Sequence, residues 1–382
     1  MKIALFGGSF DPVHNEHIRL AKAAIEQLDL DKLFVIPAFS PPHKKWKTIS
    51  SDEVRLEMCR LAFSGITKVE ISDYEILQKG TSYTYLTCRH FRDLYPSSEI
   101  YFLMGGDMLR DFPTWKNPTS ILQDVTLAAC GREEENGWEE VEQKAFLDKF
   151  GVPFKAVHYN GGAISSTKIR VLAGAGMPLT GFVPDSVADY IQATGLYAIK
   201  NADKALALEK PERREHSIRV AELAASLSER WEVPQKQAIQ AALFHDCAKN
   251  LPLRHPLLEG FAFREEWGEV PSPVVHQFTG AYLAEKLGID DEDVLSAIRY
   301  HTSGRENMSK LETLIFLADM LEAGRAFDGV EELRLLLNKG NDECLLACLK
   351  RSLDFIESKG GEVYPLTKQA YSYYQEKRGE SL

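Results

Sequence analysis

Long apolar runs are missing from this chain of 382 residues. No stretch approaches the roughly 20 consecutive apolar residues that a membrane-spanning helix needs, and the run before Gly7 is too short for the core of a signal peptide. The net charge of -11 also argues against a nucleic-acid-binding surface spread over the whole chain. We therefore expect a cytoplasmic protein whose partners include neither a membrane nor a nucleic acid. A homo-oligomer is possible.

Paired cysteines are absent as well. The 6 cysteines are scattered without a C-x-x-C motif, which is typical of reduced thiols rather than of a disulfide framework or a zinc-thiolate site. Hydrophobic residues make up 44% of the chain and charged residues 26%, as in an ordinary globular protein. Because a single hydrophobic core rarely grows beyond roughly 250–300 residues, the length predicts two domains.

The first part of the chain alternates short apolar runs with amphipathic stretches. Strands are expected at 2–6, 33–37, 69–71, 99–104, 125–129 and 154–158. Helices are expected between several of them, at 14–28, 54–63 and 83–95. This alternation predicts an α/β domain with a Rossmann-like, doubly wound parallel sheet over residues 1–200. The acidic segment 133–143 has little pattern, and we expect a solvated surface insertion there.

Strand patterns end at about residue 203. The amphipathic stretches that follow lie at 212–231, 234–246, 274–287, 291–301, 309–323, 330–338 and 341–358. Such a series predicts an all-α domain over residues 201–382.

The clearest motif follows the first expected strand and opens the first expected helix. It reads Gly7-Gly8-Ser9-Phe10-Asp11-Pro12-Val13-His14-Asn15-Glu16-His17. Glycines let backbone N–H groups approach a phosphate closely, and a helix N-terminus favours negative charge. His14 and His17 share one face of the first helical turn. Two imidazoles beside such a turn suit the stabilisation of charge during phosphoryl or nucleotidyl transfer.

A second anion-binding pattern lies near the end of the expected α/β domain. It reads Ile164-Ser165-Ser166-Thr167-Lys168-Ile169-Arg170. Ser165 or Ser166 can cap a helix whose N-terminus faces an anion. Arg170 adds a planar guanidinium that can bind a phosphate with two hydrogen bonds. The sequence therefore predicts two groups of phosphate contacts in one domain.

Together the two motifs resemble the G-G-x-F-D-P-x-H-x-G-H and I-S-S-T-x-I-R patterns of the HxGH-type nucleotidyltransferases. Within that superfamily the chain is most similar to the bacterial nicotinate mononucleotide adenylyltransferases. Three more segments carry this likeness: Pro41-Pro42-His43-Lys44, Thr81-Ser82-Tyr83-Thr84, and Gly105-Gly106-Asp107-Met108-Leu109 followed by Trp115. The resemblance implies transfer of AMP from ATP, which carries Mg²⁺, to nicotinate mononucleotide in NAD biosynthesis. Phosphopantetheine adenylyltransferases share the first motif and remain an alternative.

The resemblance also assigns roles to residues. His14 and His17 would stabilise the α-phosphate, and Arg170 would complete the catalytic set. The contacts to ATP and to the acceptor would come from Gly7, Gly8, Ser9, Phe10, Lys44, Thr84, Gly105, Asp107, Trp115, Ser165 and Ser166. One residue departs from the pattern, because Glu16 stands where the family has glycine. A carboxylate there is expected to crowd and repel the ATP phosphates.

Histidine and aspartate dominate the chemistry of the second half. They occur in or at the end of separate expected helices, as His216, His245-Asp246, His276, His301 and Asp319. These side chains suit iron, manganese or another first-row divalent ion. A buried aspartate without a partner costs several kcal/mol, so each one should have a cation or hydrogen bonds. The dispersed residues therefore predict a metal site between helices.

This pattern resembles that of the HD phosphohydrolases that cleave diadenosine tetraphosphate symmetrically into two ADP. It comprises His245-Asp246-Cys247-Ala248-Lys249, Tyr300-His301-Thr302-Ser303-Gly304 and Ala318-Asp319-Met320-Leu321-Glu322-Ala323-Gly324-Arg325. The resemblance implies one or two Fe or Mn ions bound by His216, His245, Asp246 and Asp319, with Asp246 also catalytic. Substrate contacts would come from Lys249, His276, His301, Thr302, Ser303 and Arg325. Gln277 replaces the usual glycine, and Ala323-Gly324 stands where proline is common. A nucleotide-sensing module without hydrolysis is the alternative.

Overall fold

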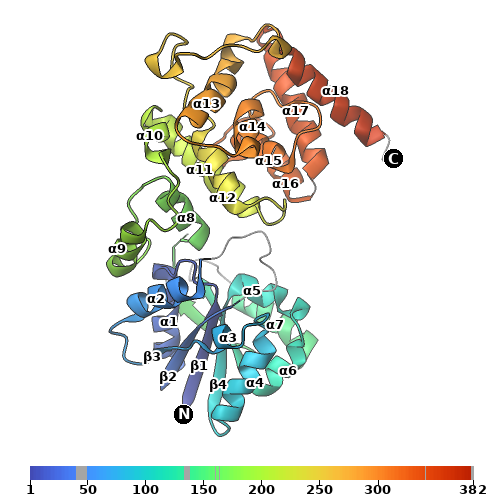
Figure 1. Cartoon of the computed structure of the whole chain (residues 1–382). Coiled ribbons are helices and arrows are strands. Elements are labelled where there is room, and N and C mark those ends of the chain that lie inside the picture. The colour runs from blue at the N-terminus through green and yellow to red at the C-terminus, as the bar shows by residue number, and fades with distance from the viewer. Residues whose placement is uncertain (40–49, 133–137, 160, 163, 340, 380–382) are drawn as a thin grey trace. The chain divides into compact units, whose positions relative to one another are not determined.

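The computed structural model describes residues 1–39, 50–132, 138–159, 161–162, 164–339 and 341–379 (Figure 1). These residues form two compact units. The first takes in the described residues of 1–169 and 179–196, and the second those of 170–178 and 197–382. Among the described residues, no helix combines the length and the apolar character that a membrane span requires.

A parallel sheet forms the centre of the first unit. Its strands are β1 (Lys2–Gly8), β2 (Lys32–Pro37), β3 (Val69–Ile71), β4 (Glu99–Gly105), β5 (Thr126–Arg132) and β6 (Lys155–Tyr159). They lie in the order β3-β2-β1-β4-β5-β6, and every neighbouring pair is parallel. The chain thus winds outward from β1 in one direction and from β4 in the other. Ligands bind at such a switch point, beyond the carboxyl ends of the two central strands.

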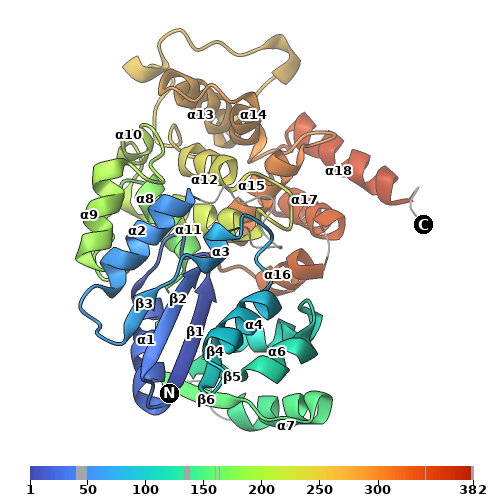
Figure 2. The ribbon, with the colours of Figure 1, turned by 60° about the horizontal axis from the view of Figure 1, so that its bottom comes forward.

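Helices cover both faces of this sheet (Figure 2). The helices up to residue 196 are α1 (Asn15–Gln27), α2 (Asp52–Phe63), α3 (Tyr74–Leu77), α4 (Thr84–Leu94), α5 (Gly106–Asp111), α6 (Pro118–Asp124), α7 (Trp138–Phe150), α8 (Ser166–Gly174) and α9 (Asp185–Thr194), of which α8 and α9 lie away from the sheet. Alternate residues of β1 show why helices must pack on both faces of the sheet. Ile3 and Leu5 pack with Phe91 of α4 on one face, while Ala4 and Phe6 are buried on the other. The predicted doubly wound α/β domain is confirmed.

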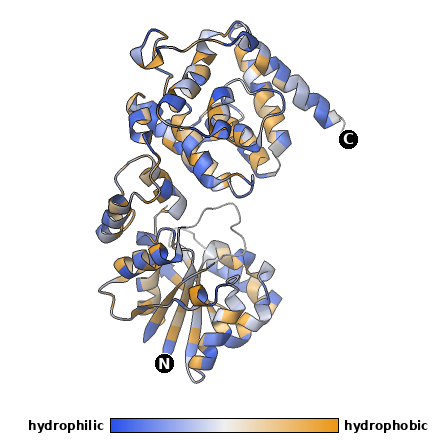
Figure 3. Cartoon of the chain, in the orientation of Figure 1, coloured by the Kyte–Doolittle hydropathy of each residue, from blue (hydrophilic) through white to orange (hydrophobic). Residues whose placement is uncertain are grey.

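In the described residues of the second unit, the regular elements are α-helices and short 3₁₀ turns. The α-helices are α10 (Ala202–Ala207), α11 (Pro211–Leu227), α12 (Gln235–Phe244), α13 (Val275–Lys286), α14 (Glu292–Tyr300), α15 (Lys310–Leu321), α16 (Val330–Lys339), α17 (Asn341–Ser358) and α18 (Pro365–Gly379). Most carry separate hydrophobic and hydrophilic bands (Figure 3). The apolar residues of α15 are buried almost throughout, and a capping box of Ser309 and Glu312 starts this helix. The predicted all-α region is confirmed.

The expected surface insertion at 133–143 needs correction. Residues 133–137 lie outside the described residues, and helix α7 starts at Trp138. Its later turns hold Phe146 and Phe150, whose rings contact each other and Phe112. The acidic composition of the first turn therefore concealed a helix that is anchored by aromatic residues further along. Helix α18 was also absent from the sequence prediction.

Candidate functional site

The connection from β1 to α1 brings two imidazoles together. His14 precedes α1 and His17 lies in its first turn, with ring centroids 3.7 Å apart. The backbone N–H of His14 donates to His17 Nδ1 at 3.1 Å, so the proton of the neutral His17 ring sits on Nε2. Burial lowers the pKa of His14 to about 4 and keeps its ring neutral at pH 7. Both imidazoles can therefore serve as neutral hydrogen-bonding groups.

Aromatic side chains pack within the same β1–α1 connection. Gly7 and Gly8 end β1, and Phe10 follows with a positive φ of 47°. The Phe10 ring is buried and contacts the rings of Phe6 and His17. A Cβ atom at Gly8 would lie 3.0 Å from the Phe10 ring. Glycine is thus needed where the backbone passes this close to an aromatic side chain.

A fully buried arginine, which the sequence analysis missed, holds this connection in place. Arg55 of α2 donates from Nη1 to the carbonyl of Ser9 at 2.9 Å and from Nε to the carbonyl of Ser50 at 3.0 Å. Its Nη2 contacts Asp52 at 2.5 Å. The guanidinium therefore ties the anion-binding turn to the start of α2. The only sequence signal was an arginine on the apolar face of an amphipathic helix.

The Glu16 carboxylate lies against a pair of glycines. Glu16 is buried and forms an ion pair with Arg19. A Cβ at Gly161 would lie 2.6 Å from its Oε2, and one at Gly162 would lie 3.6 Å from its Oε1. Oε2 has no hydrogen-bond partner among the described residues. The negative charge expected from the sequence is thus present, but a guanidinium accompanies it.

The second anion-binding motif forms the start of α8. Ser165 Oγ accepts a hydrogen bond from the Lys168 N–H at 3.2 Å, which caps the helix. Ser166 Oγ donates to the carbonyl of Pro12 at 2.9 Å and so joins α8 to the first motif. Arg170 lies one turn further on. Its buried guanidinium donates from Nε to Gln235 at 2.8 Å, so its role in phosphate binding stays a prediction.

The residues expected around the acceptor lie at the ends of β4 and α4. Gly105 ends β4 directly before α5, and Thr84 is the first residue of α4. Trp115 is half-buried and packs edge-on against Phe102, which favours a packing role for its ring. Lys44 and the side chain of Asp107 lie outside the described residues.

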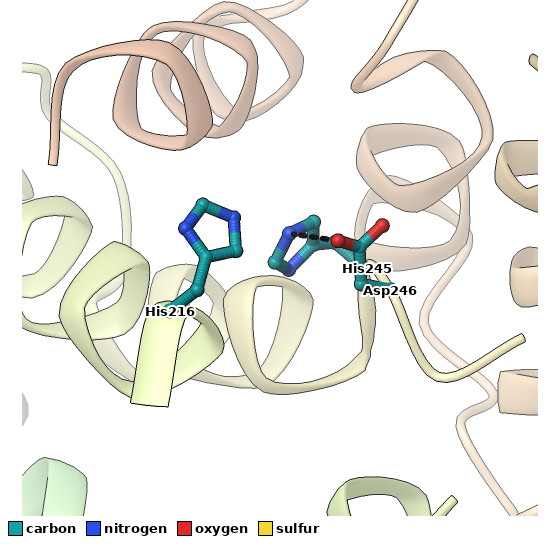
Figure 4. A group of neighbouring side chains, drawn as sticks. All are labelled: His216, His245 and Asp246. Atoms are coloured by element: carbon teal, nitrogen blue, oxygen red, sulfur yellow. Dashed lines mark ion pairs between the residues drawn. The ribbon is translucent and has the colours of Figure 1, made fainter. Parts of the chain in front are cut away.

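In the second unit, the predicted metal ligands converge from several helices. His216 comes from α11, His245 and Asp246 follow α12, and Asp319 comes from α15. Figure 4 shows His216, His245 and Asp246 side by side, with the ion pair between the last two. His276 of α13 and His301 at the end of α14 join them. The six residues form three overlapping groups whose ligand atoms lie within 4.8 Å of one another.

Hydrogen bonds fix the orientation of the histidine rings. His245 Nδ1 lies 2.7 Å from the carbonyl of Ala242, and His301 Nδ1 lies 2.7 Å from the carbonyl of Ile298. Because a carbonyl only accepts, each ring must donate from Nδ1, and its Nε2 faces the cluster. His216 Nδ1 contacts Glu322 at 3.0 Å in the same way. Such outer partners are typical of metal-binding histidines.

Unpaired atoms provide the test of whether this cluster suits a metal ion. His245 Nε2 and Asp246 Oδ1 are buried without a hydrogen-bond partner among the described residues. Asp246 Oδ1 also lies 3.5 Å from His301 Nε2 and 3.6 Å from the ammonium of Lys249. A carboxylate oxygen and an imidazole nitrogen that face each other in a buried space require a proton or a cation between them. The donor set of imidazoles and carboxylates therefore fits a first-row divalent ion.

Burial and neighbouring charges set the charge states of these side chains. Burial alone would raise the pKa values of Asp246 and Asp319, but neighbouring histidines hold both well below the usual range. Burial lowers the pKa of His276 to about 4. The aspartates are thus ionised and His276 is neutral at pH 7. Burial alone would lower the pKa of His245, but the same carboxylates raise it to about 9, so a metal ion bound here would displace a proton from that ring.

Three cationic side chains contact the cluster, and each is about a third exposed. Arg213 Nη1 lies 3.0 Å from Asp246, and Arg325 Nη2 lies 2.5 Å from Asp319. Lys249 Nζ lies 2.8 Å from His276 Nε2. Lys249 and Arg325 were predicted from the sequence, whereas Arg213 was missed. The position of Arg213 one helical turn before His216 was the sequence feature that could have identified it.

Two neighbouring residues that were predicted to bind substrate differ in their surroundings. The Thr302 hydroxyl lies 3.0 Å from His276 Nε2, at the cluster. Ser303 is buried, and its hydroxyl accepts from Gln277 at 2.9 Å and donates to the carbonyl of Gly304 at 2.9 Å. The Ser303 hydroxyl thus serves the fold of this segment.

Comparisons with known proteins agree with this division. A cytidylyltransferase-like family model matches residues 5–172, and an HD domain model matches residues 213–324. A Mycoplasma genitalium protein named "Probable nicotinate-nucleotide adenylyltransferase/Ap4A hydrolase" is 32% identical over 85% of this chain and 88% of its own. The chain belongs to this two-domain family.

A second two-domain relative and a solved structure are also similar to this chain. The Mycoplasma pneumoniae protein of the same name is 30% identical over 85% of this chain and 89% of its own. A crystal structure titled as a predicted HD superfamily hydrolase involved in NAD metabolism, from Clostridium acetobutylicum, is 37% identical over 47% of this chain and 96% of its own, with a TM-score of 0.43. Members of the two-domain family thus match both units of this chain.

Proposed function

We propose that the first unit transfers the adenylyl group of ATP to nicotinate mononucleotide. A phosphate oxygen of the mononucleotide attacks the α-phosphorus of ATP, the bond from that phosphorus to the bridging oxygen breaks, and pyrophosphate leaves. The stacked pair of His14 and His17 beyond the carboxyl end of β1 is the observation that carries this proposal. The names of the two-domain relatives support the choice of acceptor.

Binding and charge neutralisation account for this reaction without a protein nucleophile. His17 donates from Nε2, and His14 lies beside it, to stabilise the α-phosphate as it becomes pentavalent. The N-terminus of α8, with Ser165 and Ser166, receives the β- and γ-phosphates. Mg²⁺ enters with ATP and reduces the charge of its phosphates. Thr84, the first residue of α4, is a proposed contact of the acceptor, as are Lys44, Asp107 and Trp115.

Competition between acceptors tests the first proposal. The intact protein is given ATP and equal concentrations of nicotinate mononucleotide, nicotinamide mononucleotide and phosphopantetheine. We expect nicotinate adenine dinucleotide as the main product. Dephospho-coenzyme A as the main product would instead identify the alternative acceptor and overturn the proposal.

We propose that the second unit hydrolyses diadenosine tetraphosphate symmetrically. Water attacks one of the two central phosphorus atoms, the bond to the oxygen between them breaks, and two ADP molecules leave. Convergence of His216, His245, Asp246 and Asp319, with unpaired acceptor atoms, is the observation that carries this proposal. These residues would hold one Fe or Mn ion, and His276 and His301 would hold a second ion or the phosphates. Bound metal would supply Lewis acidity.

Cationic groups at the cluster suit a substrate with four phosphates. Lys249, Arg213 and Arg325 each contact a predicted ligand residue and each remain partly exposed. Guanidinium groups bind phosphate oxygens with paired hydrogen bonds. We propose that Thr302 also contacts the phosphates. Ser303 does not, because its hydroxyl is buried and already hydrogen-bonded within the protein.

Metal removal separates hydrolysis from nucleotide sensing. The protein is stripped with a chelator and reloaded with Fe²⁺, Mn²⁺ or Mg²⁺, and both the turnover and the binding of diadenosine tetraphosphate are measured. We expect turnover to two ADP after loading with Fe²⁺ or Mn²⁺. Metal-dependent binding of the nucleotide without turnover would contradict the proposal and identify a sensing module.

A further inference from the structure

Gln277 makes an unusual set of hydrogen bonds for a side chain next to a predicted site residue. It follows His276 on α13 and is fully buried. Its Oε1 accepts from the backbone N–H groups of Thr302 at 3.2 Å and Ser303 at 3.0 Å. Its Nε2 donates to Ser303 Oγ at 2.9 Å. One amide thus fixes two consecutive residues of the segment after α14.

The histidine in that segment has a support of its own. His301 is oriented by the carbonyl of Ile298, which lies in the same helix end. Among the described residues, the side-chain hydrogen bonds of Gln277 go to Thr302 and Ser303, and none goes to His301 or to another predicted ligand. Loss of the amide should therefore disturb Thr302 more than the ligand cluster.

Thr302 is placed where an anion would be bound. Its hydroxyl lies 3.0 Å from His276 Nε2, and the ammonium of Lys249 lies 2.8 Å from the same nitrogen. A hydroxyl and an ammonium that flank one imidazole can both donate to a phosphate oxygen. The position of the hydroxyl depends on the backbone at Thr302, and Gln277 holds that backbone.

We propose that Gln277 is a positioning residue that sets the Thr302 hydroxyl for a phosphate of the substrate. This inference rests on the proposed function of the second unit. It predicts a separation of effects: variants at Gln277 weaken phosphate binding, while the metal affinity stays the same. A purely structural role would lower both together.

Binding of ADP to the Mn²⁺-loaded full chain tests the proposal, with Mn²⁺ affinity measured separately by calorimetry. Gln277→Met keeps the size of the side chain and removes its hydrogen bonds. We expect ADP affinity to fall about tenfold, as for the loss of one or two buried hydrogen bonds, and Mn²⁺ affinity to change by less than about twofold. Thr302→Val should weaken ADP binding to a similar extent.

The double variant shows whether Gln277 acts through Thr302. Gln277→Met combined with Thr302→Val should bind ADP no more than about twofold more weakly than Thr302→Val alone. If Gln277→Met does not fold, Ser303→Ala removes the acceptor of Gln277 Nε2, together with the local hydrogen bond to the Gly304 carbonyl, and should weaken ADP binding about threefold.

Three results would overturn the proposal: unchanged ADP affinity, a parallel loss of Mn²⁺ affinity, or additive effects in the double variant. Turnover of diadenosine tetraphosphate by the unaltered protein is a separate readout. Its absence would contradict the proposed function, while the ADP measurements would still decide the role of Gln277.

Discussion

The two candidate sites are built in different ways. In the first unit, His14 and His17 lie in one short stretch of chain between β1 and α1. In the second, six residues from α11, α13, α15 and the ends of α12 and α14 meet in overlapping groups. The first site is therefore a local structure that backbone geometry and a buried arginine maintain, whereas the second exists only when the helices are packed.

This difference determines which kind of change each site should tolerate. Around His14 and His17, the surrounding contacts involve backbone atoms and ring packing. Around Asp246, nearly every contact joins charged or ligand-type side chains. Single substitutions should thus have larger effects in the second unit, and the effects should stay within the unit.

The largest effect is expected for Asp246→Asn. Asp246 belongs to two of the three ligand groups, so its loss should abolish metal binding and reduce hydrolysis by about 10³-fold or more. Metal content and the turnover of diadenosine tetraphosphate measure this. Asp354→Asn, at an exposed carboxylate of α17, is the control. An equal loss of adenylyl transfer in Asp246→Asn would contradict the separation of the two sites.

A smaller but complementary effect is expected for His17→Ala. Removal of one hydrogen-bond donor to a developing charge costs about 10²–10³-fold in kcat, and the hydrolytic reaction should be unchanged. Steady-state kinetics of both reactions provide the measurement, with His158→Ala, at the half-exposed ring on β6, as control. A loss below about threefold would exclude His17 from the transition state.

The pH dependence of the stability of the first unit should reflect protonation of the His14 ring. Its pKa is about 4 in the folded protein and about 6.5 in an unfolded chain. The unfolded state binds the His14 proton more tightly than the folded state does, so the contribution of the buried neutral ring to the free energy of unfolding is complete above pH 6.5. The free energy of unfolding should decline by about 3 kcal/mol as the pH falls towards 4.

Titration of the His14 ring by NMR and urea unfolding at several pH values check this prediction. His14→Gln should remove that part of the pH dependence while it leaves the unfolding of the second unit unchanged. A His14 pKa close to 6.5 would show that the ring is not buried as described.

The smallest effect is expected for Glu16→Gly, which restores the residue of the family pattern. The Glu16 carboxylate is paired with Arg19 and lies beside Gly161, so its removal should change kcat/KM for ATP by less than about threefold. Arg19→Gln should lower kcat/KM more, because it leaves the carboxylate buried and unpaired. A large gain of activity in Glu16→Gly would mean that the carboxylate obstructs the ATP site.

Much of the fold follows from sequence patterns, for reasons that the structure makes clear. Strands such as β1 and β4 are continuous apolar runs because they are buried on both faces. Helix α7 was missed because its first turn is acidic and its anchoring residues, Phe146 and Phe150, come later. A segment is recognised from its sequence most easily when its hydrophobic pattern begins at its first residue.

Prediction of the sites was limited in a similar way. Ligand-type residues such as His216 and Asp319 could be named individually, because their chemistry is visible in one residue. The supporting contacts of Arg55, Arg213 and Gln277 could not, since each depends on which distant backbone or carboxylate lies beside it. Hydrogen bonds between distant segments arise only from the tertiary fold.

Product analysis of the intact protein tests the central claim most directly. Purified protein is incubated with ATP and nicotinate mononucleotide and, separately, with diadenosine tetraphosphate and Fe²⁺ or Mn²⁺, and all nucleotides are separated and identified. We expect nicotinate adenine dinucleotide with pyrophosphate in the first reaction and ADP alone in the second. Formation of ATP and AMP from diadenosine tetraphosphate, or no dinucleotide in the first reaction, would contradict this claim.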